Sequence, residues 1–262
     1  RQMSRYKIEA FVIRTNRITE SSRVLTLYSR EMGKVKCVAK GVGRPKSKLG
    51  GKVELFNLIE GDLYKKETTE LGVLSGAGLL EDFKGISGDA RKYGFASAWC
   101  EVLDRTSHSE EPHPETFELT FNYFKVLRSA KTESAGLLFW SALLKFLTLE
   151  GYGPALDACI SCGKPVARDR LLITLQRGGL IGHECVELDE PVVQVTPEAL
   201  DLLRAMMELP LSKLDEIAID KRTGKQVAEV ILSLASYHLG LPRNLKSFRF
   251  IEDLTDSGRL GA

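Results

Sequence analysis

The spacing of apolar residues changes near residue 83, and this change constrains the fold more than any other feature of the sequence. Before it, short segments rich in β-branched and aromatic residues alternate with Gly, Asn and Ser, a pattern typical of strands joined by turns. The expected strands are residues 9–19, 22–29, 33–41, 51–66 and 69–82. Five short strands suit a small closed barrel, because closure leaves no sheet edge exposed, and the OB-fold is one such barrel.

Beyond residue 83 the apolar residues recur at helical spacing. Helices are expected over residues 89–107, 114–130, 133–153, 196–209 and 223–240. The third is apolar nearly all round, which predicts a central buried helix, and Thr196 before Pro197 indicates a capped helix start. The chain is therefore predicted to be an α+β protein whose parts are an OB-fold barrel (1–82), an all-α domain in two pieces (83–158 and 191–250), an inserted segment (159–190) and a tail (251–262).

Charge is distributed unevenly along the chain. The net charge is only +2, yet residues 1–52 carry 14 Lys and Arg against three Glu, so the remainder is acidic. This split predicts a polyanionic partner for the barrel, with nucleic acid the first candidate, while a solvated charged face remains the alternative.

The third expected strand and the loop after it place many of these charges. In "KVKCVAK" (34–40) side chains alternate, so the lysines point away from Val35, Cys37 and Ala39. The loop "GVGRPKSKLGGK" (41–52) is predicted to be mobile and able to approach a phosphate chain closely. The side chains expected to contact nucleic acid are Arg14, Arg17, Lys34, Lys36, Lys40, Arg44, Lys46, Lys48 and Lys52.

Cysteines form the second recognisable pattern. Cys159 and Cys162 make a C-x-x-C step, and Cys185 follows after a strand-like stretch and a turn. This spacing predicts a closed, structural zinc site in a ribbon, with the neutral imidazole of His183 as the candidate fourth ligand. A decayed ribbon without metal and a redox C-x-x-C are the alternatives, and the latter needs a thioredoxin-like βαβ context that the sequence lacks. Five cysteines, too few for a disulfide scaffold, favour a reducing cytosolic setting.

A search for catalytic patterns finds none. The four histidines lie outside any hydrolase or metalloprotease motif, and the glycine-rich loop lacks the spacing of a Walker motif. The protein is therefore predicted not to be an enzyme. A zinc hydrolase or deaminase using the three cysteines and His183 is the less favoured alternative. The sequence has no run of 18 apolar residues and no signal-peptide pattern, so no membrane partner is expected.

Residues 28–64, "YSREMGKVKCVAKGVGRPKSKLGGKVELFNLIEGDLY", resemble the signature barrel of the RecO recombination-mediator family. The later "GYGP" step and "CISCG…GGLIGHEC" are similar to the rest of that family, so the resemblance covers nearly the whole chain. One departure is Gly182, which stands where the commonest metal set of the family has a third cysteine. Some relatives lack the cysteines altogether, so the resemblance implies that the fold forms without a metal.

The resemblance implies an N-terminal OB-fold, a C-terminal helical domain and a zinc-ribbon-like insertion. It further implies a DNA repair protein of the bacterial cytoplasm and nucleoid that binds single- and double-stranded DNA and anneals complementary strands. With RecR it would help to load RecA onto DNA coated by single-stranded-DNA-binding protein. In this sequence the implied DNA contacts are Arg44, Lys46 and Lys48 of the loop and Lys34, Lys36 and Lys40 of the strand before it.

The residues themselves support electrostatic binding that is independent of base sequence. Aromatic side chains able to stack on bases are sparse in the barrel, namely Phe11, Tyr28, Phe56 and Tyr64, and Phe56 suits a core position. Binding is therefore expected to depend strongly on salt. An RNA-binding OB-fold protein remains the alternative within the same class.

Overall fold

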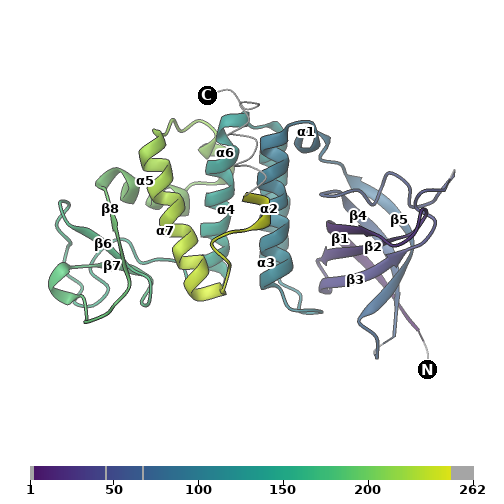
Figure 1. Cartoon of the computed structure of the whole chain (residues 1–262), viewed down its shortest axis with the longest axis horizontal. Coiled ribbons are helices and arrows are strands. Elements are labelled where there is room, and N and C mark those ends of the chain that lie inside the picture. The colour runs from purple at the N-terminus through teal and green to yellow at the C-terminus, as the bar shows by residue number, and fades with distance from the viewer. Residues whose placement is uncertain (1–2, 45, 67, 249–262) are drawn as a thin grey trace. The chain divides into compact units, whose positions relative to one another are not determined.

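The computed structural model describes residues 3–44, 46–66 and 68–248. They divide into two compact units, the barrel unit (residues 3–128) and the helical unit (residues 129–248), both visible in Figure 1. The chain is a mixed α+β protein, with strands first and helices after them, as the change of periodicity predicts. The finer domain boundaries expected from the sequence remain predictions, and the expected tail lies outside the described residues.

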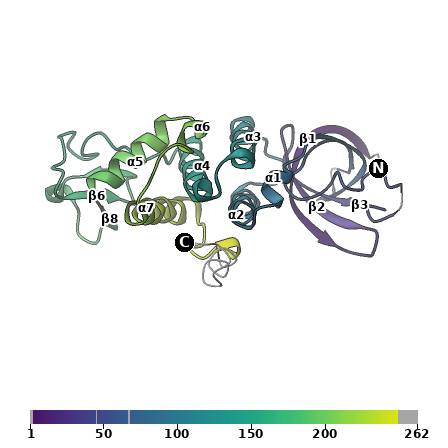
Figure 2. The same cartoon turned by 90° about the horizontal axis from the view of Figure 1, so that it is seen from above.

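The barrel consists of β1 (Ser4–Arg17), β2 (Arg23–Ser29), β3 (Gly33–Ala39), β4 (Leu58–Lys65) and β5 (Leu71–Glu81). The strands close in the order β1-β2-β3-β5-β4, and β4 returns to pair with β1; Figure 2 shows them curving round to close. Every neighbouring pair is antiparallel except β3 and β5, which run parallel.

Alternating side chains fill the barrel. The core includes Ile8, Ala10 and Val12 of β1, with matching residues from the other four strands. In β3 the predicted alternation is confirmed, since Val35, Cys37 and Ala39 are buried whereas Lys36 is exposed. Because side chains alternate along a strand, the residues of β3 between these buried ones face outward from the barrel.

The fourth strand begins later than the sequence indicates, so the expectation of a strand from residue 51 is wrong. Residues 51–57 form turns, and β4 starts at Leu58. Phe56 has a φ of 72°, a left-handed conformation that cannot continue a strand. Its ring instead packs against Tyr93 and Phe124. Propensity suggested a strand here, but tertiary aromatic packing determined the backbone.

Three helices belong to the barrel unit, namely α1 (Lys84–Ser87), α2 (Ala90–Thr106) and α3 (Pro114–Ser129). They cover the outer face of β1, where the ring of Phe11 contacts the rings of Phe83, Phe117 and Phe124. The Asp89 side chain caps the start of α2, because it accepts hydrogen bonds from the backbone N–H groups of Arg91 and Lys92. Both faces of β1 are therefore buried over this stretch.

The helical unit contains the short turn η1 (Thr132–Ser134), then α4 (Ala135–Leu149), α5 (Pro197–Glu208), α6 (Leu211–Leu214) and α7 (Lys221–Leu239). Helix α4 packs against α5, α6 and α7, which confirms its expected central position. The predicted cap is also confirmed, because the Thr196 side chain accepts a hydrogen bond from Ala199 N. No helix within the described part of the chain is long and apolar enough to cross a bilayer.

A small antiparallel sheet interrupts the helices of this unit. Its strands are β6 (Leu171–Thr174), β7 (Gly179–Ile181) and β8 (Val192–Val195), in the order β7-β6-β8. The 3₁₀ turn η2 (His183–Cys185) follows β7 directly. The sheet thus returns the chain from the C-x-x-C step to Cys185.

Candidate nucleic-acid surface and cysteine cluster

The basic residues of β3 have different environments. Lys36 is exposed, and Lys40, just after the strand, is exposed as well. The Lys34 side chain is only 14% exposed, because its Nζ donates to Asp104 O and lies 3.7 Å from the Asp104 carboxylate. Lys34 therefore makes its polar contacts with Asp104 inside the barrel unit rather than with solvent.

The loop between β3 and β4 is anchored in the barrel. Val42, Leu49 and Val53 are buried in the barrel core, and Ser47 Oγ accepts hydrogen bonds from the backbone N–H groups of Leu49 and Gly50. These contacts hold Val42, Leu49 and Val53 in the barrel, while the mobility expected from the glycines and charges of the loop stays a prediction. The anchoring leaves the basic side chains between the anchor points projecting into solvent.

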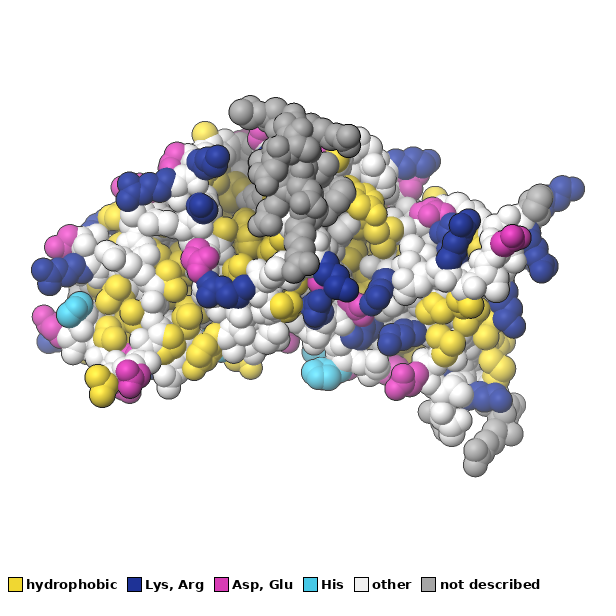
Figure 3. Space-filling model, viewed as in Figure 1, with side chains coloured by type: hydrophobic (Ala, Val, Ile, Leu, Met, Phe, Trp, Pro, Cys, Tyr) yellow, Lys and Arg dark blue, Asp and Glu magenta, His cyan; other side chains and the backbone are white. Residues whose placement is uncertain are grey.

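The basic side chains of this loop fall into two groups. Arg44, Lys46 and Lys48 are exposed, whereas Lys52 is half-buried and its Nζ donates to Ala77 O at 2.8 Å. Of the cations predicted to contact nucleic acid, six are exposed and have no ion-pair partner among the described residues; we name them the free cations: Arg17, Lys36, Lys40, Arg44, Lys46 and Lys48. On the face of the barrel unit visible in Figure 3, Lys and Arg side chains stand apart, with acidic and apolar ones between them.

Strand register places part of this set on one outer face. Arg14, Thr26 and Lys36 are cross-strand neighbours on β1, β2 and β3. With strands about 4.8 Å apart, Arg14 and Lys36 lie roughly 10 Å from each other. Arg14 is exposed but pairs with Asp104 at 3.1 Å. Lys36 is therefore the free charge of this row.

The next row on the same outer face is apolar. Val24, Val38 and Val73 are neighbours on β2, β3 and β5, and Tyr64 of β4 pairs with Val73; all four side chains are half-buried. We call them the apolar row. By contrast, the other barrel aromatics proposed for stacking are buried, including Tyr28 with 1% of its surface exposed. Register between strands, which the sequence does not reveal, identifies this row.

A groove of about 620 Å³ lies elsewhere on the barrel, over β1, β4 and β5. Its charged lining residues are Arg5, Lys7, Glu9, Glu31, Glu60 and Asp62. Arg5 is neutralised by Asp62 at 2.9 Å, and the acidic side chains outnumber the basic ones. This charge balance does not suit a polyanion, so the groove is a poorer candidate than the β2–β3 face.

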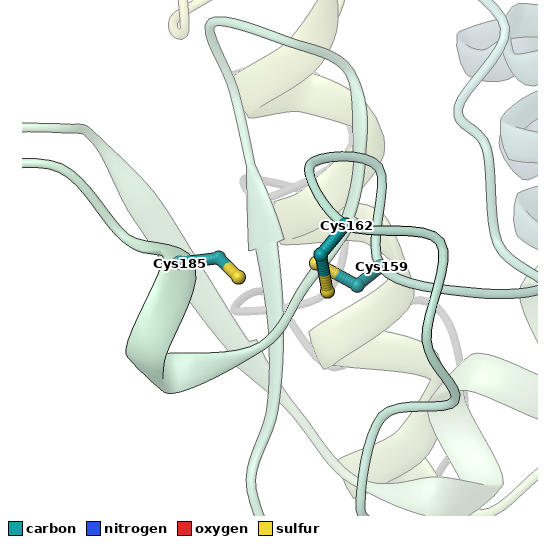
Figure 4. Close-up of side chains that lie close together, drawn as sticks. All are labelled: Cys159, Cys162 and Cys185. Carbon is teal, nitrogen blue, oxygen red and sulfur yellow. The ribbon is translucent and has the colours of Figure 1, made fainter.

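The structure brings the three predicted cysteine ligands together. The sulfur atoms of Cys159, Cys162 and Cys185 all lie within 4.8 Å of one another, and Figure 4 shows that of Cys185 directed from η2 toward the other two. Thiolates bound tetrahedrally to zinc at about 2.3 Å are about 3.8 Å apart, so a small closure of this group fits the metal. Gly163, with a φ of 71°, donates its N–H to Cys159 O at 2.8 Å and closes the C-x-x-C turn.

Backbone amides prepare one of these sulfurs to carry charge. Burial raises the pKa of the Cys159 thiol, but hydrogen bonds from backbone N–H groups, including Gly182 N at 3.3 Å, outweigh burial and lower the pKa to about 6. Hydrogen bonds with Cys162 and Cys159 raise the pKa of Cys185 to about 11. A thiolate is therefore available near neutral pH, as a metal ligand requires.

The expected fourth ligand is not part of the cluster. His183 is exposed, and no imidazole nitrogen lies in the group of donor atoms found among the described residues.

The sequence also did not reveal Arg177, whose Nη2 donates to Cys185 O at 3.2 Å and to Glu190 at 2.6 Å. The Glu190 carboxylate, 2% exposed, also accepts a hydrogen bond from Thr174. The sequence indicates the turn that carries Arg177, but it does not indicate that Glu190 is the partner of Arg177.

A five-stranded barrel that carries the free cations, followed by helices and a cysteine-bearing sheet, defines a class of two-part α+β proteins. Two known families match the chain, and the boundary between them lies where the strands end and the helices begin. The family description "Recombination protein O N terminal" matches residues 3–83, and "Recombination protein O C terminal" matches residues 87–247. The chain therefore belongs to the RecO family, and this membership supports a role in DNA repair.

Relatives named DNA repair protein RecO align over most of the chain. That of Desulfitobacterium hafniense is 33% identical over 231 residues, which are 87% of this chain and 83% of the relative. That of Pelotomaculum thermopropionicum is 28% identical over 250 residues, 95% and 94% of the two chains. That of Bacillus subtilis is 27% identical over 248 residues, again 95% and 94%.

Proposed function

We propose that this protein is a recombination mediator without catalytic activity, which binds single- and double-stranded DNA through its barrel and anneals complementary strands. The observation that carries the proposal is the set of free cations, at the end of β1, on β3 and in the loop after β3, which have no ion-pair partner among the described residues. Family membership and the names of the relatives support DNA as the polyanion. RecR, single-stranded-DNA-binding protein and RecA are the partners that a RecO-type mediator would require, and the bacterial nucleoid is where it would act.

We infer that the barrel is an OB-fold. The strand order β1-β2-β3-β5-β4, closed by β4 on β1 and with β3 parallel to β5, supports this inference. OB-folds bind oligonucleotides over the face of the second and third strands. On this protein that face carries Lys36 together with the apolar row.

The chemistry of this face favours phosphate contacts over base recognition. Free cations displace counterions from the phosphate chain, so affinity would fall steeply with salt. The apolar row offers three valines and one half-buried tyrosine, which can contact bases but provide few hydrogen bonds to distinguish them. A basic surface that offsets backbone repulsion while the bases remain free to pair suits strand annealing.

We further propose that the cysteine cluster binds zinc as a structural ion. The three sulfur donors suit a thiophilic metal, and their mutual distances are close to those of a zinc site. Bound zinc would join the C-x-x-C turn to η2 and so stabilise the zinc-ribbon-like sheet. A catalytic use of this site, as in a hydrolase or deaminase, has no further support from the residues around it.

Charge reversal of the loop tests the DNA-binding proposal. Lys46→Glu with Lys48→Glu should weaken single-strand binding and annealing by more than about tenfold at moderate salt, because two phosphate contacts become repulsive. The matched control is Lys213→Glu with Lys225→Glu, which makes the same charge change at exposed positions of the helical unit. Equal affinity of both variants would refute the proposed surface.

The same assay separates the related alternatives. DNA and RNA strands of one sequence are compared, since an RNA-binding protein would use 2′-hydroxyl contacts and prefer RNA. Annealing is then measured with single-stranded-DNA-binding protein on the strands, alone and with RecR. A mediator should anneal the coated strands, whereas a simple cation-driven binder should not.

A further inference from the structure

We propose that the metal in the cysteine cluster is held by three thiolates and keeps an open fourth position beside Gly182, where a small thiol from solution can bind. The proposal rests on the metal binding proposed above but differs from it, because a closed structural site has no exchangeable ligand. It concerns the cluster alone and does not depend on DNA binding.

Gly182 leaves space at the cluster. Its backbone lies against the sulfurs, since its N–H donates to Cys159 Sγ at 3.3 Å. A Cβ built on Gly182 would meet only that sulfur, 3.9 Å away, apart from its own chain neighbours. A side chain at this position would therefore enter the cluster, and glycine provides none.

No other described residue supplies the missing donor. The group of metal-ligating atoms within the described ranges contains the three cysteine sulfurs alone. His183 and Glu184 are exposed on η2, and Glu190 is engaged by Arg177. The side chains of the described residues thus account for three of the four positions of a tetrahedral ion.

The three-sulfur arrangement is held in place independently of a fourth ligand. Arg177 Nη2 binds Cys185 O at 3.2 Å and fixes the end of η2, while Gly163 N–H closes the turn at Cys159. Cys162 is exposed, so the cluster is reachable from solvent. A preformed, accessible set of three cysteine sulfurs favours a soft external donor such as a thiol in the remaining position.

Co²⁺ provides the test, because it occupies thiolate sites of this kind and its visible absorption reports its ligands. Adding 2-mercaptoethanol to the Co²⁺-loaded full-length protein should shift the visible spectrum in a saturable way. An unchanged spectrum overturns the proposal, and so does failure of the protein to bind Co²⁺ or Zn²⁺ at all. DNA binding, measured separately, is expected to be unaffected by either result.

Gly182→Cys is the decisive variant. Gly182 has a φ of −70° and a ψ of 141°, a conformation that cysteine adopts without strain. Its Co²⁺ spectrum should not respond to 2-mercaptoethanol, and its Zn²⁺ affinity in chelator competition should rise at least about tenfold, since outer-shell groups alone are worth about 10- to 100-fold.

His183→Ala is the matched control, expected to resemble the natural protein in Zn²⁺ affinity and in its response to the thiol. A tenfold loss of affinity in this variant would identify His183 as the fourth ligand and refute the open position. No gain of affinity in Gly182→Cys would also refute the open position. The thiol titration of the unsubstituted protein needs no variant, so the proposal is testable even if one substitution impairs folding.

Discussion

The loop between β3 and β4 and the segment of residues 157–190, which contains β6, β7 and the cysteine cluster, are held by different interactions. Buried apolar side chains anchor the first, and its charges project outward. Sulfur atoms, an arginine and a buried carboxylate organise the second. Electrostatic attraction to a phosphate chain acts over about 8–10 Å and tolerates displaced side chains, whereas metal ligation depends on tenths of an ångström. The difference predicts that the two regions respond to different perturbations.

Removing the metal should affect only the second region. Cys159→Ser should reduce Zn²⁺ affinity by more than about 100-fold, because a direct ligand is worth more than the outer-shell groups. A strong chelator should remove the metal from the unsubstituted protein. Salt-dependent DNA affinity should stay within about twofold of the natural value, since the free cations lie on the barrel. Chelator competition and fluorescence anisotropy measure the two quantities. A parallel loss of DNA affinity would show that the regions are coupled.

The buried ion pair should make the second region sensitive to acid. Hydrogen bonding to Arg177 lowers the pKa of Glu190 from about 4.5 to about 2. Protonation of Glu190 therefore favours the unfolded chain, so its contribution to stability is complete above about pH 4.5 and is lost as the pH falls toward 2. Glu190→Gln should lower the free energy of unfolding of the helical unit by about 3 kcal/mol at pH 7.

Urea unfolding at pH 7 and pH 3 checks this prediction. The difference in stability between the natural protein and Glu190→Gln should shrink at pH 3, because Glu190 is then protonated in the unfolded chain but still largely ionised in the folded protein. Glu187→Gln is the control, since its exposed carboxylate lies 3.7 Å from Arg177 and contributes little. A difference that stays constant with pH would contradict the assigned pKa.

Lys34 and Lys36 of β3 allow a structural lysine and a proposed DNA-binding lysine to be compared within one strand. Lys34→Ala should lower stability by about 1–2 kcal/mol, because it leaves Asp104 O without its donor, and should leave DNA affinity nearly unchanged. Lys36→Ala should do the reverse and weaken DNA binding about fivefold through one lost phosphate contact. Thermal unfolding and DNA titration of both variants test the assignment. Similar effects of the two substitutions would contradict it.

These residues also show how far the sequence can predict the structure. The switch from strands to helices, the inward row of β3 and the grouping of three cysteines follow from periodicity and spacing, which are local. The engagement of Lys34 by Asp104, seventy positions away, and of Arg177 by Glu190 depends on tertiary contacts. The same holds for Phe56, whose aromatic neighbours lie on α2 and α3 and override its strand propensity.

The smallest expected effect distinguishes two lysines of the β3–β4 loop by the salt dependence of DNA binding. Each phosphate contact contributes about 0.7 to the slope of log affinity against log salt for a single strand, so Lys46→Ala should reduce the slope by about that amount. Lys52→Ala should change the slope much less, because its Nζ is bound to Ala77 O. Anisotropy titrations at four salt concentrations resolve the two slopes. If Lys52→Ala lowered the slope as much as Lys46→Ala, the Lys52 side chain would have to leave its barrel contact to meet DNA, and the loop would be less firmly anchored than its buried residues indicate.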